Sequence, residues 1–250
     1  MKIKNKKYKE WDIYFPEREL FLLKIGEKII DKKYSVLKVY KDTIRNYVVK
    51  IKIEDKIFIL KSPKSEVILP QRKFMSLLKK GEAISTLENI NNLERELEKN
   101  FVKIYLAVVK KKFFIEESYI LMEYIEGEIL KNEEDLIKMM EIVNNIHNKK
   151  IYHGDLNASN FINTGKIIKI IDSQGKREKL SSFKRWYDIF TLKNDLLVQE
   201  LKFNVEKYYY NKKKGFSFYI AYLLKNFKNL KLVKKIKEKK KELRKKGWKI

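Results

Sequence analysis

Two short polar stretches in the middle of the chain, residues 152–160 (YHGDLNASN) and 171–175 (IDSQG), carry side chains that could do chemistry. In the first stretch Asp155 is followed five residues later by Asn160, and the second stretch holds Asp172. This spacing is typical of a phosphotransfer loop, in which the Asp accepts the proton of the attacking hydroxyl and the Asn binds Mg²⁺. Asp155 is therefore a candidate catalytic base, and Asn160 and Asp172 are candidate metal ligands.

A predicted hairpin over residues 161–171 would bring the two candidate metal ligands together. Asn160 immediately precedes its first strand and Asp172 immediately follows its second strand, so both lie at its open end. Mg²⁺ takes few protein ligands and completes its shell with water and phosphate oxygens, which suits two oxygen ligands side by side. The preceding His153 and Gly154 are expected to shape the loop, His153 by packing rather than by titrating. A loop of turn-forming residues alone is the alternative interpretation.

Hydrophobic periodicity predicts sheet, helix, sheet, helix, a small hairpin and further helices along the chain. Strands are predicted at residues 36–40, 47–53, 57–61, 112–116 and 119–124. Helical spacing extends over residues 71–99 with a break at Gly81, and Asn132 is predicted to cap a helix with acidic residues in its first turn. From about residue 180 onward the pattern is helical. Because there is no repeat and no Gly/Ser-rich linker, we expect a single domain over residues 1–250.

The order of these elements predicts an α+β fold with an antiparallel-sheet N-terminal lobe and a mostly helical C-terminal lobe. Together with the phosphotransfer loop, this order resembles the bilobal protein-kinase-like superfamily. The resemblance implies an N-terminal lobe at about residues 1–122, a hinge at 123–127 (EYIEG) and a C-terminal lobe at about residues 128–250. The hinge main chain from Glu123 to Ile125 would then form hydrogen bonds with adenine.

The same resemblance assigns nucleotide-binding roles to two charged side chains of the N-terminal lobe. Lys61 ends an apolar predicted strand, where the superfamily has the lysine that binds the α- and β-phosphates of ATP. Its partner would be a Glu on the following helix, either Glu82, which we favour, or Glu88. A surface lysine is the alternative interpretation of Lys61, because the chain holds 51 Lys.

Three departures from protein kinases concern the substrate and the phosphate loop. Residues 153–155 read His-Gly-Asp, without the Arg that binds an activation-loop phosphate. Only 15 residues separate Asp172 from Asp188, which leaves little room for a segment that docks a peptide. Both features favour a kinase of small molecules or glycans. The Gly-rich phosphate loop expected near residues 40–47 holds no Gly, so Lys or Thr43 side chains would cover the phosphates, or the cover would be poor.

Within that superfamily, the sequence is similar to the lipopolysaccharide core heptose(II) kinase family of Gram-negative bacteria over about residues 8–214. The similarity is carried by the segments FILKSPKS, ILMEYIEG, HGD, NFI and IIDSQGKR. The family implies transfer of the γ-phosphate of ATP, with Mg²⁺, to a heptose hydroxyl of the lipopolysaccharide inner core at the cytoplasmic face of the inner membrane. Lys176 and Arg177 are candidates for contacts with phosphate groups of the acceptor. Asn157 stands where many such enzymes have Lys or His, so the group that balances the charge of Asp155 is open.

Two other functions stay open at this point. The first is a kinase of another sugar or small molecule, similar to aminoglycoside phosphotransferases, which a pocket lined with acidic side chains would favour. The second is a non-catalytic module with a kinase fold that binds an anionic membrane or nucleic acid, which an absence of nucleotide binding would favour.

Composition and charge exclude several classes of protein. The chain has no Cys, which rules out disulfide frameworks, thiolate zinc sites and cysteine nucleophiles. Its net charge of +25 indicates anionic surroundings, although biased base composition accounts for part of the Lys excess. With only 7 Arg beside 51 Lys, the chain is a poor fit to sequence-specific nucleic-acid binding. No apolar run approaches the roughly 20 residues of a membrane-spanning helix, and no secretory signal is seen, so we expect a cytoplasmic protein.

The basic stretch 225–249 contributes 13 basic and 2 acidic residues. Apolar residues recur in it at helical spacing: Phe227, Leu230, Val233 and Ile236. This pattern predicts a basic amphipathic helix. Such a helix would either pack its apolar stripe on the C-terminal lobe or attach to anionic lipid or phosphorylated glycan.

Overall fold

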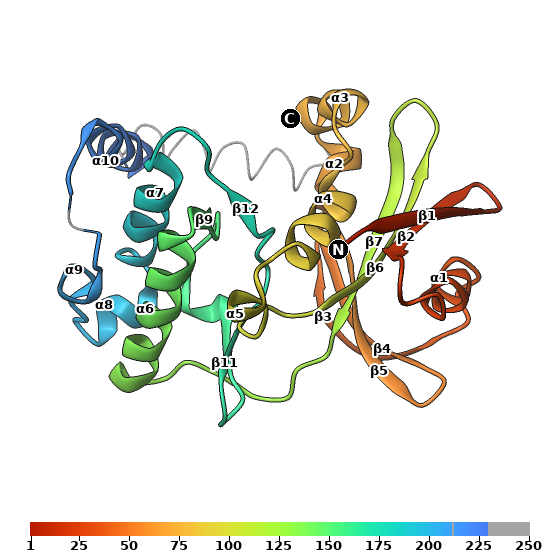
Figure 1. Cartoon of the computed structure of the whole chain (residues 1–250), viewed down its shortest axis with the longest axis horizontal. Helices are drawn as coiled ribbons and strands as arrows, with labels where there is room; N and C mark the ends of the chain where they lie inside the picture. The colour runs from red at the N-terminus through yellow and green to blue at the C-terminus, as the bar shows by residue number, and fades with distance from the viewer. Residues whose placement is uncertain (212, 230–250) are drawn as a thin grey trace. The chain divides into compact units, whose positions relative to one another are not determined.

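The computed structural model describes residues 1–211 and 213–229 of the chain (Figure 1). These residues divide into two compact units. The first unit comprises Met1–Leu93 and Val102–Tyr124, and the second comprises Glu94–Phe101 and the described residues from Ile125 onward. Residues 94–101, which the sequence suggests for the N-terminal lobe, thus belong to the second unit.

An antiparallel sheet of seven strands forms the frame of the first unit. Its strand order is β1-β2-β6-β7-β5-β4-β3. The strands are β1 (Ile3–Tyr8), β2 (Trp11–Pro16), β3 (Ser35–Asp42), β4 (Tyr47–Ile53), β5 (Lys56–Ser62), β6 (Ile104–Lys111) and β7 (Ile115–Glu123). The predicted meander of three strands is confirmed as β3, β4 and β5, and the pairing of β5 with β7 places Lys61 opposite Ile120.

Part of the predicted sheet is wrong. The strand predicted at residues 112–116 is not a strand over most of its length, because residues 112–114 form the turn between β6 and β7. The neighbouring strand is β6, and its residues 106–108 are fully buried, so its sequence shows no alternation of apolar and polar residues. Sequence analysis also assigns no strand to β1, whose sequence IKNKKY has the composition of a basic tail.

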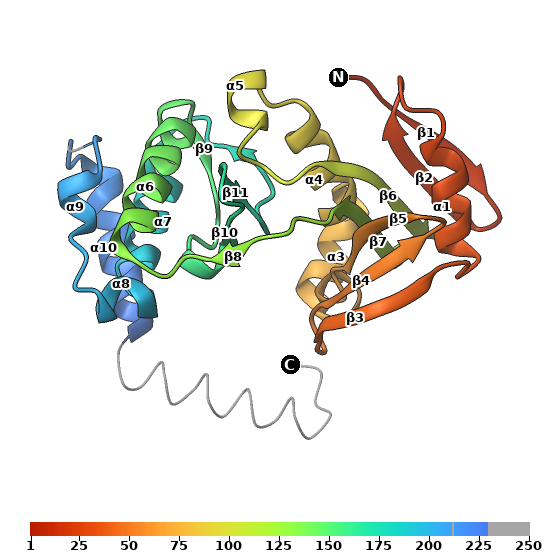
Figure 2. The same cartoon turned by 90° about the horizontal axis from the view of Figure 1, so that it is seen from below.

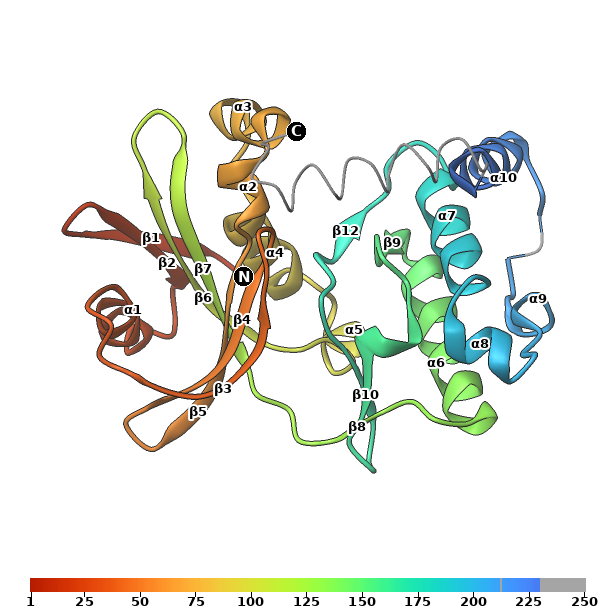
Figure 3. The ribbon, with the colours of Figure 1, turned by 180° about the vertical axis from the view of Figure 1, so that it is seen from behind.

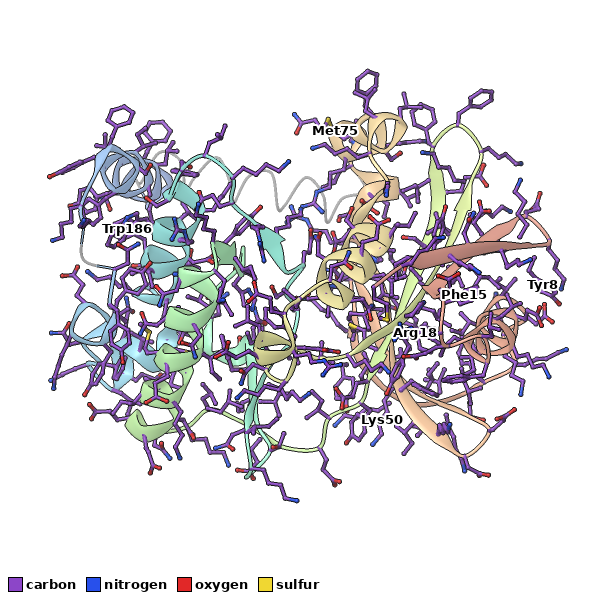
Figure 4. All side chains as sticks on the ribbon, viewed as in Figure 1. Tyr8, Phe15, Arg18, Lys50, Met75 and Trp186 are labelled. Atoms are coloured by element: carbon purple, nitrogen blue, oxygen red, sulfur yellow. The ribbon has the colours of Figure 1, made fainter. Side chains whose placement is uncertain are left out.

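Helices cover both faces of this sheet (Figure 2). The region predicted as helical contains α3 (Pro70–Leu78) and α4 (Glu82–Asn91), preceded by the short α2 (Ser65–Ile68). Ala83, Leu87 and Ile90 of α4 are buried, and α4 packs on β6 and β7. On the other face α1 (Leu22–Ile30) covers the core of the unit, which includes the fully buried Phe15 labelled in Figure 4.

The second unit is mostly helical. Its helices are α5 (Arg95–Glu98), α6 (Glu133–Asn148), α7 (Phe183–Leu192), α8 (Leu196–Glu200), α9 (Val205–Tyr208) and α10 (Phe216–Asn229), with a 3₁₀ turn at Ala158–Asn160. Five short strands form two small sheets: β8 (Glu128–Ile129), β9 (Ile151–Tyr152), β10 (Phe161–Asn163), β11 (Ile168–Ile170) and β12 (Lys176–Arg177). The helical character predicted from about residue 180 is confirmed within the described range as four helices separated by short loops.

The cap and buried face predicted for the long helix of this unit are confirmed in α6. The Asn132 side chain accepts a hydrogen bond from the Asp135 N–H at 2.9 Å. The apolar face of α6 from Leu136 to Ile146 is buried. The Asp135 carboxylate also accepts from Asn163 Nδ2 at 2.8 Å, so the start of α6 is tied to the β10–β11 hairpin.

The basic stretch 225–249 reaches the described part of the chain only at the end of α10. Lys225 donates a hydrogen bond to Thr191 Oγ1 at 3.0 Å, and Phe227 is exposed. The other apolar positions of the predicted helix, Leu230, Val233 and Ile236, lie outside the described residues. None of the described helices is long and apolar enough to cross a bilayer.

Together, an antiparallel sheet with covering helices in one unit and a mostly helical second unit make this an α+β chain of the bilobal protein-kinase-like fold.

Gly81, at the start of α4, offers a test of how the sheet and this helix are packed. Its φ is +87°, and a Cβ there would lie 2.4 Å from the Cδ1 atom of the buried Ile115. We expect Gly81→Ala to lower the free energy of unfolding by about 2–3 kcal/mol, because backbone strain and overpacking add. Urea unfolding followed by circular dichroism measures the change.

The matched control is Gly165→Ala, since Gly165 has a φ of +82° but no atom within 4 Å of the added Cβ. It isolates the backbone strain and should cost about 1 kcal/mol. Equal losses in the two variants would show that packing against Ile115 contributes nothing.

Candidate active site

The loop that follows β9 holds Asp155 with an exposed side chain. Asn157 Nδ2 donates to Asp155 Oδ1 at 2.9 Å, so one oxygen of the carboxylate is oriented by an amide. The Asp155 carbonyl oxygen accepts from Asn160 Nδ2 at 2.8 Å. Leu156, between them, is fully buried and anchors the loop. The Asp155 carboxylate thus contacts a neutral hydrogen-bond donor.

The main chain of this loop is held by Asp188, a residue of α7 that sequence analysis did not select. The Asp188 carboxylate is only 1% exposed and accepts the N–H groups of His153 at 2.6 Å and Gly154 at 2.9 Å. Gly154 has a φ of +91°, a conformation that favours glycine. The only signal in the sequence is an acidic residue on the apolar face of α7, next to Trp186 and Ile189.

A second carboxylate supports the far end of the loop. Asp195 Oδ2 accepts the N–H of Ala158 at 3.2 Å, and its Oδ1 accepts the N–H of Leu197 at 3.0 Å as the cap of α8. The loop is therefore fixed by two carboxylates, that of Asp188 within α7 and that of Asp195 at the start of α8. Figure 3 shows α7 and α8 beside α6 and β9 in the second unit.

His153 is buried, and its environment keeps it neutral. Burial lowers the pKa of its imidazole, and the nearby charges of Asp188, Asp172 and Asp155 offset this only in part. Its Nδ1 accepts the Asp155 N–H at 3.4 Å, and its ring lies 5.8 Å from that of Phe161. These contacts are those of a residue that packs and shapes the loop.

The predicted hairpin geometry at Asn160 and Asp172 is present in the main chain. β10 and β11 pair in register, and the Ile171 N–H donates to the Asn160 carbonyl oxygen at 2.9 Å. Asp172 follows directly, with a φ of +57°. The amide nitrogen of Asn160 donates to Asp155, which leaves its Oδ1 as an acceptor.

The hairpin brings the main chain of Asn160 and Asp172 together, and a carboxylate and an amide oxygen are ligands that fit the hard-oxygen preference of Mg²⁺. In the described ranges, 1–211 and 213–229, no three His, Cys, Asp or Glu side chains gather into a cluster that could hold a metal ion. A site for Mg²⁺ needs no such cluster, because the ion keeps water and phosphate oxygens in its shell.

In the first unit, the structure brings Lys61 and Glu82 together. Lys61 Nζ lies 3.7 Å from Glu82 Oε1, and both side chains are 12% exposed. The rival Glu88 instead contacts Lys80 at 2.7 Å. Glu82 is thus the glutamate of α4 that contacts the strand lysine.

Arg72 of α3 joins this pair and was not singled out from the sequence. Its Nη1 lies 3.5 Å from Glu82 Oε2 and donates to Ser65 Oγ at 2.8 Å. Each oxygen of the Glu82 carboxylate therefore contacts one cation, Lys61 or Arg72. The scarcity of Arg in the chain is the one sequence signal that could have drawn attention to it.

The turn between β3 and β4 takes the place of the expected Gly-rich loop. Thr43 Oγ1 accepts the N–H groups of Arg45 at 3.3 Å and Asn46 at 3.1 Å, and the hydroxyl donates to the Asn46 carbonyl oxygen. The Thr43 hydroxyl is therefore used inside the turn. It orders a short turn without glycine.

The hinge residues lie where β7 ends. The Glu123 N–H donates to the Lys103 carbonyl oxygen at 2.9 Å, and the Glu123 carboxylate accepts the Lys103 N–H at 3.1 Å. An adenine contact by Glu123 would therefore use its carbonyl oxygen. Tyr124 follows, with its ring 3.7 Å from Lys50 Nζ, and Ile125 lies in an irregular segment.

Lys176 and Arg177 form β12, which pairs with β9 immediately before the Asp155 loop. Both side chains are exposed, and Arg177 Nη2 lies 3.7 Å from Glu94 Oε1. Contact of Arg177 with an acceptor phosphate would have to compete with this exposed ion pair.

The chain resembles known proteins along most of its length. A protein of Escherichia coli (strain K12), "Lipopolysaccharide core heptose(II) kinase WaaY", is 25% identical over 181 residues, which cover 70% of this chain and 78% of that protein. Residues 2–239 match the family described as "Lipopolysaccharide core biosynthesis protein (WaaY)". Because this match extends over nearly the whole sequence, the chain belongs to the WaaY family of lipopolysaccharide core biosynthesis proteins.

Proposed function

We propose that this kinase transfers the γ-phosphate of ATP to a hydroxyl of a heptose in the lipopolysaccharide inner core. The observation that carries the proposal is the Asp155 loop, because its carboxylate is exposed while its main chain is fixed by buried partners. Membership of the WaaY family and the name of the Escherichia coli relative support heptose as the acceptor sugar. Since ATP is the donor, we expect the reaction at the cytoplasmic face of the inner membrane.

In this proposal Asp155 accepts the proton of the acceptor hydroxyl as the oxygen attacks phosphorus. One carboxylate oxygen is held by Asn157, so the other is the acceptor of the proton. The amide orients the carboxylate without placing a positive charge beside it. Asp188 acts as a positioning residue, because it fixes the main chain immediately before Asp155.

Asn160 and Asp172 would hold Mg²⁺, which neutralises charge on the phosphates when it is bound. In the first unit, Lys61 would bind the α- and β-phosphates, and Glu82 would hold the lysine in place. Glu123 and Ile125 would contact adenine through the main chain. Lys176 and Arg177 are exposed and would meet phosphate groups of the acceptor.

Arg72 is a candidate for the phosphate contact that a glycine-rich loop would otherwise make. It shares the Glu82 carboxylate with Lys61 and is itself about half exposed, so its guanidinium can reach a ligand. We propose that Arg72 supplies a second phosphate contact, since a guanidinium binds phosphate with two N–H groups.

The function is tested by incubating purified protein with Mg-ATP and core oligosaccharide that lacks phosphate on heptose. We expect a mass gain of one phosphate group, located on a heptose by fragmentation in the mass spectrometer. Core oligosaccharide from cells with and without the gene should differ by the same group. Phosphorylation of aminoglycosides but not of the core would contradict the proposed acceptor.

Asp155→Asn should reduce turnover by about 10²–10⁴-fold, because it removes the proton acceptor and keeps the shape of the side chain. Nucleotide binding, measured by isothermal titration with Mg-ATP, should stay near that of the unmodified protein. Asp55→Asn, in the exposed turn between β4 and β5, is the control. Turnover equal to the control would remove Asp155 from the reaction.

Arg72→Met should raise the KM for ATP by at least about tenfold, because the loss of one charge-assisted hydrogen bond alone has about that effect. The KM for the acceptor should not change, so initial rates at varied concentrations of each substrate separate the two effects. Arg18→Met is the control, since Arg18 is an exposed arginine of the same unit, labelled in Figure 4. An unchanged KM for ATP would show that Arg72 only braces Glu82.

A further inference from the structure

Helix α3 carries apolar side chains on the face that it turns to solvent. Phe74 is 62% exposed and Leu78 is 77% exposed, and Leu77 beside them is also exposed. Residues spaced by three and four positions lie on one helix face, so these three form a continuous apolar stripe. Met75, labelled on α3 in Figure 4, is exposed as well.

The opposite face of α3 is polar and packs inward. Ser76 is 2% exposed, its Oγ accepts the Ile115 N–H at 3.3 Å, and its carbonyl oxygen accepts from Lys111 Nζ at 2.9 Å. Arg72 is directed to Glu82 and Ser65. The helix is thus amphipathic, but its polar face packs inward and its apolar face is exposed, which is the reverse of the usual arrangement. Packing within the first unit does not explain its apolar stripe.

The turn between β6 and β7 lies beside α3 and adds to the same surface (Figures 1 and 3). Phe113, at the tip of this hairpin, is 82% exposed. Its neighbour Phe114 has Lys73 Nζ of α3 5.3 Å from its ring centroid, which joins the two elements. We call Phe74, Leu77, Leu78 and Phe113 the α3 surface.

Lysines lie next to the α3 surface, and Lys79 and Lys112 among them are exposed. Lys80 and Lys110 form ion pairs, and Lys111 donates to the Ser76 carbonyl oxygen. The sequence places Lys79 and Lys80 at the end of α3 and Lys110, Lys111 and Lys112 before Phe113. Glu88 contacts Lys80, and Glu10 and Glu116 contact Lys110. The exposed apolar side chains of this region therefore lie among lysines.

We propose that the α3 surface docks on an anionic lipid bilayer. Its apolar side chains would enter the boundary of the acyl chains, and the lysines around them would contact headgroup phosphates. Charge complementarity favours a bilayer over a second copy of the chain, because two copies of this surface would bring like charges together. This inference does not depend on the acceptor of the proposed kinase, since it concerns lipid alone.

The absence of cysteine from the chain allows a local test. Leu78→Cys and Phe113→Cys each provide one site for an environment-sensitive fluorophore, and Leu180→Cys, at a fully exposed position of the second unit, is the control. With vesicles of phosphatidylglycerol and phosphatidylcholine, emission should shift to the blue at residues 78 and 113 but not at 180. No shift at 78 and 113, or an equal shift at all three, would overturn the proposal.

A second experiment measures the contribution of the surface to binding. Phe74→Ser with Phe113→Ser should weaken sedimentation with the same vesicles by at least about tenfold, because two large apolar side chains no longer enter the bilayer. Leu180→Ser with Leu196→Ser, both at exposed positions, is the matched control and should bind as the unmodified chain does. Thermal melting establishes that each variant is folded.

Two results would contradict the proposal, and a third would contradict its electrostatic part. Unchanged sedimentation of the Phe74/Phe113 variant would place lipid binding elsewhere, for example in the basic stretch 225–249. A stable dimer of the unmodified chain in analytical ultracentrifugation without lipid, lost in that variant, would make the surface an interface between copies. Binding that persists in high salt and on pure phosphatidylcholine would exclude the part assigned to the lysines.

Discussion

The buried carboxylate of Asp188 is the constraint on which the geometry of the second unit depends. A carboxylate buried to 1% exposure is costly unless its oxygens accept hydrogen bonds, and here the main-chain N–H groups of His153 and Gly154 supply them. His147 Nε2 lies 3.5 Å away and also faces it. The hydrogen bonds required by one residue of α7 therefore fix the direction in which the chain enters the loop with Asp155.

The side chain that orients the Asp155 carboxylate is neutral although the chain carries a net charge of +25. Asn157 orients the carboxylate, Asn160 holds its carbonyl oxygen, and the burial of His153 lowers the pKa of its imidazole. Lysines and arginines instead lie in the first unit around Glu82 and on exposed surfaces. The proposed proton acceptor is thus oriented by an amide, and the cations at Glu82 lie where the proposal places the phosphates.

Local signals in the sequence were enough for the elements that depend on their own residues. The Asn132 cap, the β10–β11 hairpin and the β3–β5 meander belong to this group, as does the spacing from Asp155 to Asn160. What could not be predicted depends on partners distant in the chain. Asp188 lies 35 residues after His153, and β6 shows no alternation because helices cover both faces of its sheet.

Arg72 shows why charged residues are the hardest to interpret from sequence alone. In a chain with 51 Lys, a cation on a helix has a default interpretation as a solvated surface residue. Arg72 differs from such a surface residue because it lies on the inward face of α3. Ser76, on the same face, points to the β6–β7 hairpin and accepts the Ile115 N–H. In this rotation of α3, Arg72 lies at Glu82, and Phe74 and Leu78 face outward. The inward position of the buried serine is thus part of the same rotation that places the second cation at Glu82 and exposes the apolar stripe.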